Sequence, residues 1–331
     1  MLDTSQIILG PWEKKEQMNV MALWNEEVGK RFPMSKRLLA QNSFDNPDVY
    51  FEGSRVAKEK DSGRLVGFCV TKIHHHIDHP SRSYDKRGWV QTLLVRSSHR
   101  GRGIGTLLLN EAEASLRRSG IRQVQIGADF FHYFPGVPSE DVHTRKWFEK
   151  KGYVPSGEEF DLLFEGDNKW ILSEDPSVRF PILKPEERDR LLTFLSRTFP
   201  GRWEYEAHHY FRSGGTGREF IVAKENENII GFCRINDPSS PVLGPNVSWY
   251  PSFNGTLGGI GPLGISPEYR GKGLGKKIVA RGMRVLFDRG VSHLVIDWTT
   301  LVDFYSKLGF SVWKSYTRYQ KEWGSMEGGV S

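Results

Sequence analysis

The chain has 331 residues, which is long enough for two domains of ordinary size. Its hydrophobic content of 38% and aromatic content of 12% are typical of a folded globular protein and exclude a disordered chain. The formal net charge is +6, but the cations are spread along the sequence without a zinc-finger spacing or an aromatic RNA-binding signature, so we expect no nucleic-acid partner. No apolar run reaches the roughly 18–20 residues of a membrane span, and the N-terminus lacks a signal-peptide pattern. Because two cysteines cannot form a disulfide framework either, we expect a cytoplasmic protein.

One pattern occurs twice along the chain and organises the whole sequence. Both copies run in the order helix, hairpin, strand, glycine loop, helix, strand, short helix and closing strand. The first copy predicts a helix over 12–28, a hairpin over 56–69, a strand over 89–95, a glycine loop over 99–107, a helix ending at Gly120, a strand over 121–127 and a helical phrase over 146–153. The second copy predicts the same elements at 184–199, 222–233, 261–265, 269–277, Gly290, 291–297 and 303–310.

The join between the copies is expected within 164–181, where charged residues, serine and proline interrupt the pattern. We therefore expect two domains, 1–165 and 166–331. Cys69 and Cys233 occupy the same place in the two hairpins, so we interpret them as packed apolar residues on strands. Neither is spaced with a histidine in a recognisable nucleophile pattern, which disfavours a covalent acyl-enzyme.

The two glycine loops, "HRGRGIGTL" and "YRGKGLGKK", lead from a strand into a helix. Neither satisfies the Walker A pattern, and the G-x-G-x-x-G match at 259–264 contains Pro262 and does not open a helix. The unpaired amides and positive dipole of a helix start attract anions, and glycines let the backbone approach a pyrophosphate closely. The shared R-x-x-G-x-G pattern therefore predicts a phosphate-binding loop in each copy, at Arg100, Gly103 and Gly105 and again at Arg270, Gly273 and Gly275.

The order of elements, the R-x-x-G-x-G loop and the phrase "FYSKLGF" resemble the GNAT superfamily of acetyl-CoA-dependent N-acetyltransferases over nearly the whole chain. The resemblance implies an α+β fold of two tandem GNAT units, each with a mixed, largely antiparallel twisted sheet flanked by helices. It also implies acetyl-CoA as the cofactor, with the pyrophosphate on the loop and the pantetheine arm in a gap beside the preceding strand. The residues it assigns to coenzyme A are Leu263, Gly264, Ile265, Arg270, Gly271, Lys272, Gly273, Leu274, Gly275 and Lys276, with a second candidate site at Arg100, Gly101, Arg102, Gly103 and Gly105.

Two residues distinguish the copies as candidate catalysts. In many GNAT enzymes the tyrosine of the "FYSKLGF" phrase protonates the departing thiolate; Tyr305 holds this position, and Phe148 holds it in the first copy. Asp297, at the end of a predicted strand beside the gap, is our candidate base, and Gly127 matches it in the first copy. We therefore expect the second copy to be the catalyst by direct attack, and the first to be a scaffold that can still bind coenzyme A. Capping of the turn that follows remains the alternative role for Asp297.

The acceptor is expected to be the primary amine of a small molecule. The domain layout and the Asp/Tyr chemistry resemble tandem-GNAT glucosamine and glucosaminide N-acetyltransferases, which implies an amino sugar; mycothiol synthase, another tandem GNAT enzyme, acts on a different amine. Aromatic side chains beside carboxylates suit such a ring, although they equally suit a peptide or the packing of the two copies. A protein amine remains an alternative acceptor, and a non-catalytic coenzyme A-binding module remains an alternative of another class. The candidate acceptor residues are Trp203, Tyr205, Trp249 and Tyr250, with Glu204, Glu206, His208 and His209 as further candidate acids or bases.

Two segments have no counterpart in this scheme. The insert over 129–144 is expected to be an ordered loop that covers the cleft of its own copy or meets the other copy, with contact to the acceptor as a third role. The histidines of "HHHIDH" (74–79) are expected to be surface residues, and we predict no metal, because nothing in the sequence advertises the supporting groups of a metal site. We expect a monomer or a homodimer.

Overall fold

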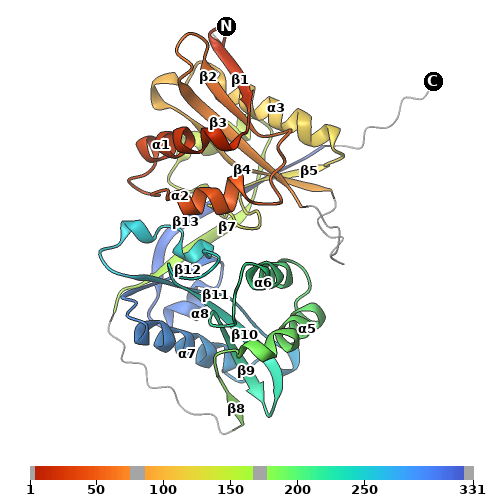
Figure 1. Cartoon of the computed structure of the whole chain (residues 1–331), viewed down its shortest axis with the longest axis vertical. Helices are drawn as coiled ribbons and strands as arrows, with labels where there is room; N and C mark the ends of the chain where they lie inside the picture. The colour runs from red at the N-terminus through yellow and green to blue at the C-terminus, as the bar shows by residue number, and fades with distance from the viewer. Residues whose placement is uncertain (1–3, 75–85, 167–176, 324–331) are drawn as a thin grey trace, which may run out of the picture. The chain divides into compact units, whose positions relative to one another are not determined.

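The computed structural model of the chain describes residues 4–74, 86–166 and 177–323 (Figure 1). Its helices are α1 (Gln17–Glu27), α2 (Lys36–Leu39), α3 (Ile104–Arg118), α4 (Val142–Lys150), α5 (Arg188–Thr198), α6 (Arg202–Arg212), α7 (Leu274–Asp288) and α8 (Val302–Ser306). Its strands are β1 (Ile7–Pro11), β2 (Arg55–Glu59), β3 (Leu65–Ile73), β4 (Arg87–Val95), β5 (Gln123–Ile126), β6 (Val137–Pro138), β7 (Val154–Phe164), β8 (Val178–Arg179), β9 (Phe220–Glu225), β10 (Asn228–Asn236), β11 (Leu257–Ile265), β12 (His293–Thr299) and β13 (Ser311–Glu322). Among these described residues, no helix is both long enough and apolar enough to span a bilayer.

The chain divides into two compact units, and their limits differ from the expected division at 165/166. The N-terminal unit contains the residues up to Glu159 together with the segment from Ser315 onward, and the C-terminal unit contains Phe160–Lys314. The difference arises because each unit takes its last strand from the other half of the sequence. The end of β13 pairs with β5, as in Tyr319 opposite Ile126, and the end of β7 pairs with β12, as in Leu162 opposite Ile296.

Each unit has the same strand order. The N-terminal sheet runs β1-β2-β3-β4-β5-β13, and the C-terminal sheet runs β8-β9-β10-β11-β12-β7. Every neighbouring pair in these two sheets is antiparallel, except for β4 with β5 and β11 with β12, which are parallel. This mixed, largely antiparallel arrangement with flanking helices confirms the predicted α+β fold.

The helix that follows each glycine loop forms because its apolar residues recur at three- and four-residue spacing. In α7 these residues are buried and pack on the sheet. Both helices end in the predicted way at a glycine with a left-handed backbone, Gly120 (φ 84°) and Gly290 (φ 82°). The amide of each following residue, Ile121 or Val291, then donates to a carbonyl five residues earlier, 3.1 Å away in both units.

The C-terminal sheet separates two hydrophobic layers. Along β9, Phe220 and Val222 pack with α5 and α6, whereas Ile221 and Ala223 pack with α7 and α8. Figure 1 shows α5 and α6 on one side of this sheet and α7 on the other. Residues of the same sheet can therefore be assigned to a face by their alternation along a strand.

The exchanged strand supplies part of the N-terminal core. Tyr319 of β13 is 1% exposed, and its ring stacks at 6.4 Å from that of Phe148. Its hydroxyl donates to Oε1 of Glu149 at 2.7 Å. The core of the N-terminal unit is therefore completed by a residue near the end of the sequence.

We predict that Tyr319→Ala lowers the free energy of unfolding by about 3–5 kcal/mol, because it empties a site that is closed on all sides. The measurement is equilibrium urea unfolding followed by circular dichroism. Val312→Ala is the control on the same strand, since Val312 is 49% exposed, and it should change stability by less than about 0.5 kcal/mol. Equal effects of the two substitutions would contradict a core role for the exchanged strand.

Candidate functional site

The two glycine loops have the same backbone conformation. Gly101 and Gly271 have φ values of 77° and 78°, and Gly103 and Gly273, which precede the first residues of α3 and α7, have φ values of 96° and 77°. Residues with side chains rarely adopt this left-handed region, so the loop shape depends on glycine. The first amides of α3 and α7 consequently face a compact turn that can accommodate an anion.

The arginine of each loop ties the loop to the strand before it. Nε of Arg100 donates to the carbonyl of Val95 at 2.9 Å, and Nε of Arg270 donates to the carbonyl of Ile265 at 3.1 Å. In the N-terminal unit, Arg100 also forms an ion pair of 2.7 Å with Glu27, whose carboxylate in addition accepts from the Ser97 amide at 2.8 Å. No carboxylate forms an ion pair with Arg270 within the described part of the chain, and Thr198 is the last residue of α5 where Glu27 is the last residue of α1.

Each unit also contains a pair of parallel strands that separate. β4 and β5 pair from Arg87 to Val90 of β4, and β11 and β12 pair from Leu257 to Gly259 of β11. Beyond these points β4 continues for five residues to Val95, and β11 for six to Ile265, without pairing to the parallel neighbour. The gap expected beside the loop is thus present in both units, and the loop lies at the end of the strand that forms one side of it.

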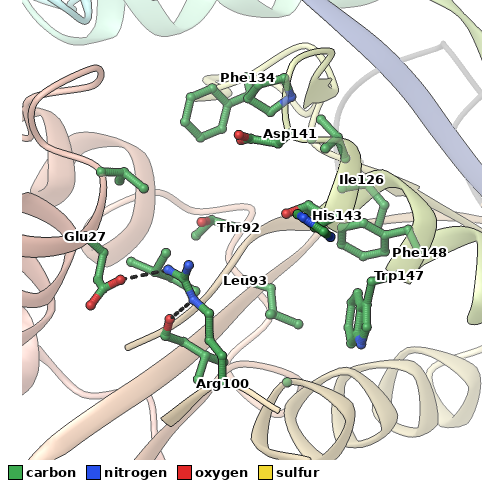
Figure 2. Close-up of a pocket in the computed structure, with 18 of the residues that line it drawn as sticks. Glu27, Thr92, Leu93, Arg100, Ile126, Phe134, Asp141, His143, Trp147 and Phe148 are labelled. Carbon is green, nitrogen blue, oxygen red and sulfur yellow. Dashed lines mark hydrogen bonds and ion pairs between the residues drawn. The ribbon is translucent and has the colours of Figure 1, made fainter. Parts of the chain in front are cut away.

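In the N-terminal unit this gap opens into a cavity of about 680 Å³. Figure 2 shows Glu27 and Arg100 at one end of the cavity, with Asp141, His143 and Phe148 at the other and Leu93 of the separated strand between them. Of the residues of the second candidate cofactor site, Arg100, Gly101, Gly103 and Gly105 line this cavity, and Arg102 does not.

The insert over 129–144 helps to enclose that same cavity, as expected for a loop that covers the cleft of its own copy. Phe134, Asp141 and His143 line the cavity. The start of the insert is anchored by a buried ion pair of 2.7 Å between Asp129 and Lys72, each with a side chain 1% exposed. Nε2 of Gln91 on β4 also donates to Asp129 at 3.1 Å.

The insert also explains the missing carboxylate in the N-terminal unit. A Cβ atom added to Gly127 would lie 2.4 Å from the carbonyl oxygen of Phe134, so no side chain fits at this position. Phe148, which matches Tyr305, is 4% exposed and packs in the core. The N-terminal unit therefore offers neither of the two predicted catalytic groups.

In the C-terminal unit, the two candidate catalytic residues lie at β12 and just beyond it. Tyr305 is 5% exposed and packs in the α7 layer with Ile296. Asp297, the next residue of β12, raises the pKa of Arg234 together with Glu206 and Tyr210 of α6. The Asp297 charge also raises the pKa of the Tyr305 phenol, so Asp297 lies near both groups.

The electrostatics of this site keep Tyr305 protonated. Burial raises the pKa of the Tyr305 phenol well above its ordinary value, and the nearby Cys233 and Asp297 raise it further. Arg234, which is 4% exposed, has its pKa lowered by burial, while Glu206, Glu219 and Asp297 act in the opposite direction. Half-buried Asp297 thus lies at the edge of a cluster of buried charges.

The other residues predicted for coenzyme A lie along the separated end of β11 and the loop after it. Gly264 is packed closely, because an added Cβ would lie 2.6 Å from the ring of Phe199. Nζ of Lys272 lies 5.0 Å from the ring centroid of Tyr269. Leu263, Gly264 and Ile265 end β11, Arg270, Gly271, Lys272 and Gly273 form the loop, and Leu274, Gly275 and Lys276 form the first turn of α7.

The predicted acceptor residues divide into packed and partly exposed groups. Trp249 is 3% exposed, and Trp203 packs against the rings of Phe199 and Phe232, so both rings contribute to the core. Tyr205 and Tyr250 are half-exposed. Of the further candidates, Glu204 and Glu206 are each 4% exposed, and His208 and His209 are half-exposed on α6.

The expectation of surface histidines at 74–79 is wrong for His74. This residue is 5% exposed, and its Nδ1 lies 3.1 Å from Oδ1 of Asp48, because it is the first residue after β3 and still belongs to the core. The remaining residues of that segment lie outside the described residues. Within the described ranges, no group of three or more potential metal-ligating side chains is found.

Comparisons with known proteins agree with this architecture. The sequence profile of the acetyltransferase (GNAT) family matches residues 18–131 and again 188–310. The chain is similar to the mycothiol acetyltransferase of Pseudarthrobacter chlorophenolicus, with 24% identity over 321 residues that cover 92% of this chain and 91% of the relative. A stretch of 123 residues is 31% identical to the mycothiol acetyltransferase of an Arthrobacter species and covers 34% of this chain and 38% of that relative.

Solved structures show the same arrangement. The chain is similar to the GCN5-related glucosamine N-acetyltransferase region in a fungal multi-domain GH3 β-N-acetylglucosaminidase, with a TM-score of 0.84 and 28% identity over 95% of this chain. It spans 38% of the length of that fungal protein. A tandem GNAT protein from the clavulanic acid biosynthesis pathway has a TM-score of 0.67 at 15% identity, covers 97% of this chain and 100% of its own, and shows the shared fold.

Two α+β units, each with separated parallel strands and a glycine loop at a helix start, define an acyl-CoA-dependent acyltransferase. The chain belongs to the GNAT acetyltransferase family, and it is an N-acetyltransferase of the tandem-GNAT type.

We predict that neither cysteine reacts in the folded protein, which would support direct transfer over a cysteine-bound acyl group. Cys69 and Cys233 are both 0% exposed, and burial raises the pKa of each thiol to about 12. Alkylation by iodoacetamide at pH 8, followed by mass spectrometry, should be at least about a hundredfold slower in the native than in the urea-unfolded protein. Native labelling of Cys233 at the unfolded rate would contradict its burial.

Proposed function

We propose that the chain transfers the acetyl group of acetyl-CoA to the primary amine of an amino sugar, and that the C-terminal unit performs the reaction. The observation that carries this proposal is that Asp297, on the separated strand β12, lies near enough to Tyr305 of α8 for its charge to raise the pKa of the phenol. The N-terminal unit has Gly127 and Phe148 at the matching positions. A carboxylate and a phenol are the two groups that amide formation from a thioester requires.

In this mechanism Asp297 accepts the proton that the amine must lose as its nitrogen attacks the thioester carbonyl carbon. Tyr305 donates its hydrogen bond, and then its proton, to the sulfur as the carbon–sulfur bond breaks. One amine proton is thus removed and one proton reaches the thiolate, so that the products are the N-acetyl amine and free coenzyme A. Because burial raises the pKa of Tyr305 above the ordinary value of about 10, the phenol keeps this proton throughout the neutral pH range.

Charge alone does not select the acceptor, because the carboxylates near Asp297 are accompanied by cations. Glu206 forms an ion pair with Arg202, and buried Arg234 lies among Glu206, Glu219 and Asp297. The 28% identity to the fungal glucosamine N-acetyltransferase region, over 95% of this chain, supports an amino sugar in particular.

We predict that the protein releases coenzyme A from acetyl-CoA in the presence of glucosamine or a glucosaminide, and that two substitutions remove this activity. Asp297→Asn should lower kcat by about a hundredfold or more, and Tyr305→Phe by about tenfold, since each removes one proton-transfer group. The measurement is a continuous thiol-release assay with a panel of amines that also contains spermidine, a lysine peptide and an aminoglycoside.

Asp303→Asn is the matched control for the Asp297 substitution, because Asp303 is exposed on α8 two residues before Tyr305. It should retain wild-type turnover. Full activity of Asp297→Asn on an amino sugar would contradict the assigned base, whereas turnover on the lysine peptide alone would contradict the acceptor class.

We further propose that the N-terminal unit is non-catalytic and that its cavity binds coenzyme A more weakly than the C-terminal unit. The loop geometry supports binding, since Gly101 and Gly103 have the same backbone as Gly271 and Gly273. The weaker affinity follows from Glu27, whose carboxylate neutralises Arg100 and adds a negative charge beside the loop. One such charge at a partly exposed site corresponds to about 1 kcal/mol, or about fivefold in Kd.

We predict that Gly103→Ala and Gly273→Ala each weaken a different coenzyme A site. Gly103 and Gly273 both have a positive φ, and an added Cβ at Gly273 meets no atom within 4 Å, so we expect the backbone strain of a residue with a side chain to cost about 1 kcal/mol, or about fivefold in Kd. Isothermal titration calorimetry should show two sites, with the tighter one affected by Gly273→Ala and the weaker one by Gly103→Ala. Only Gly273→Ala should alter turnover, and a single site that is unaffected by Gly103→Ala would contradict binding in the N-terminal unit.

A further inference from the structure

Asp297 lies in an irregular part of β12. The pairing of β12 with β7 places Ile296 opposite Leu162 and then Thr299 opposite Phe160, so three steps along β12 match two along β7. Asp297 and Trp298 therefore form a β-bulge, a feature that redirects side chains beside active sites. Trp298 has a φ of 45°, a conformation that bulky residues rarely adopt and that the surrounding structure must stabilise.

Side chains from two other elements stabilise the bulge. The amide of Trp298 donates to Oδ1 of Asp161 on β7 at 3.1 Å, and Asp161 is 4% exposed. The guanidinium of Arg202, at the start of α6, lies 4.2 Å from the ring centroid of Trp298. Nε of Arg202 is also 2.5 Å from Oε1 of buried Glu206. We call Asp161, Arg202 and Glu206 the bulge clamp.

The N-terminal unit supplies an internal comparison. Gly127 and Ala128 follow β5 with φ values of 64° and 58°, so Ala128 shares the left-handed backbone of Trp298, whereas Gly127 is left-handed and the matching Asp297 is not. In that unit the backbone itself holds the turn, because the Ala128 amide donates to the carbonyl of Phe134 at 2.9 Å. A left-handed residue directly after the Gly127 or Asp297 position therefore occurs in both units. The side-chain clamp occurs in the unit where an aspartate stands on the turn.

We propose that Asp161 and Arg202 are positioning residues, which hold the bulge so that the Asp297 carboxylate stays directed to the acceptor side of the separated strands. The proposal rests on the proposed function, because it assigns a purpose to the orientation of Asp297. A misplacement of about 1 Å of a catalytic group can reduce a rate by about a hundredfold, so the orientation of this half-buried side chain matters to the reaction. Asp161 is a residue of the first half of the sequence, and the strand exchange brings it into the C-terminal unit.

The test compares Asp161→Leu with Asp161→Asn in the full-length chain. Asparagine keeps an oxygen that accepts from the Trp298 amide, and leucine has a similar volume without an acceptor. Asp161→Leu should lower kcat on the preferred amine by about tenfold or more, with KM for acetyl-CoA within about twofold of wild type, and Asp161→Asn should stay within about threefold of wild type. Arg202→Lys, which keeps the charge but loses the planar contact with the Trp298 ring, should give an intermediate loss of kcat.

Two further measurements distinguish positioning from general stabilisation. In the Asp297→Asn background, Asp161→Leu should reduce kcat by less than about twofold, since it acts through a group that is already absent. Hydrogen exchange followed by mass spectrometry should show faster exchange of the peptide 294–303 in Asp161→Leu than in Asp161→Asn, with unchanged exchange over α7.

The outcomes separate this inference from the proposed function. Equal exchange of the 294–303 peptide in the two Asp161 variants would overturn the clamp, whatever the enzyme acetylates. Faster exchange with unchanged kcat, or a full tenfold loss that persists in the Asp297→Asn background, would overturn the positioning role. Absence of turnover by the wild type on every amine would overturn the proposed function, and the exchange comparison would then decide the clamp alone.

Discussion

In both units, one of two parallel strands continues for several residues beyond its last pairing with the other, and the candidate site lies beside that separation. The backbone of β4 from Gln91 and of β11 from Ile260 remains paired on one side, to β3 and β10, while the other side faces a gap. The glycine loop follows at the end of the separated strand, with the amides of a helix start beyond it. A single feature of sheet pairing thus places the glycine loop and the start of a helix at the end of a gap between two strands.

The two units keep this scaffold and differ in what they add to it. In the N-terminal unit, the insert brings the Phe134 carbonyl against Gly127 and helps to enclose a cavity, so that the place of a catalytic carboxylate is filled by backbone. In the C-terminal unit, Asp297 stands at the matching position before left-handed Trp298, which Asp161 and Arg202 contact. The two units therefore share one scaffold, and the N-terminal unit has Gly127 and Phe148 in the places of the carboxylate and phenol of our proposal.

The sequence predicted the parts of this fold that depend on local chemistry. The glycine loops, the amphipathic helices after them, their glycine ends and the tandem order all follow from patterns within about 30 residues, and the structure has them at the expected positions. The strand exchange was not predictable in this way, because β7 and β13 follow equivalent helices in the two copies and nothing local states which sheet each strand will join. The burial of Trp249 and His74 likewise depends on packing between distant segments.

The catalytic candidates could be found from the sequence, whereas the residues that surround them could not. Asp297 and Tyr305 could be selected by comparing the two copies position by position. Asp161, Arg202 and the left-handed Trp298 could not, because Asp161 lies 137 positions before the Trp298 amide that it binds and tryptophan carries no preference for positive φ. Residues that hold a functional group in place therefore escape a motif search even when the functional group itself does not.

The strand exchange also bears on how the protein is made. A ribosome synthesises β5 first, yet its partner in β13, Tyr319–Glu322, is translated only after Phe160–Lys314 of the C-terminal unit. Until those residues emerge, β5 presents an open strand edge and the place of Tyr319 beside Phe148 is empty. The nascent N-terminal half must therefore remain incomplete, and in need of protection from association with other chains, for the whole time that the C-terminal half is being translated.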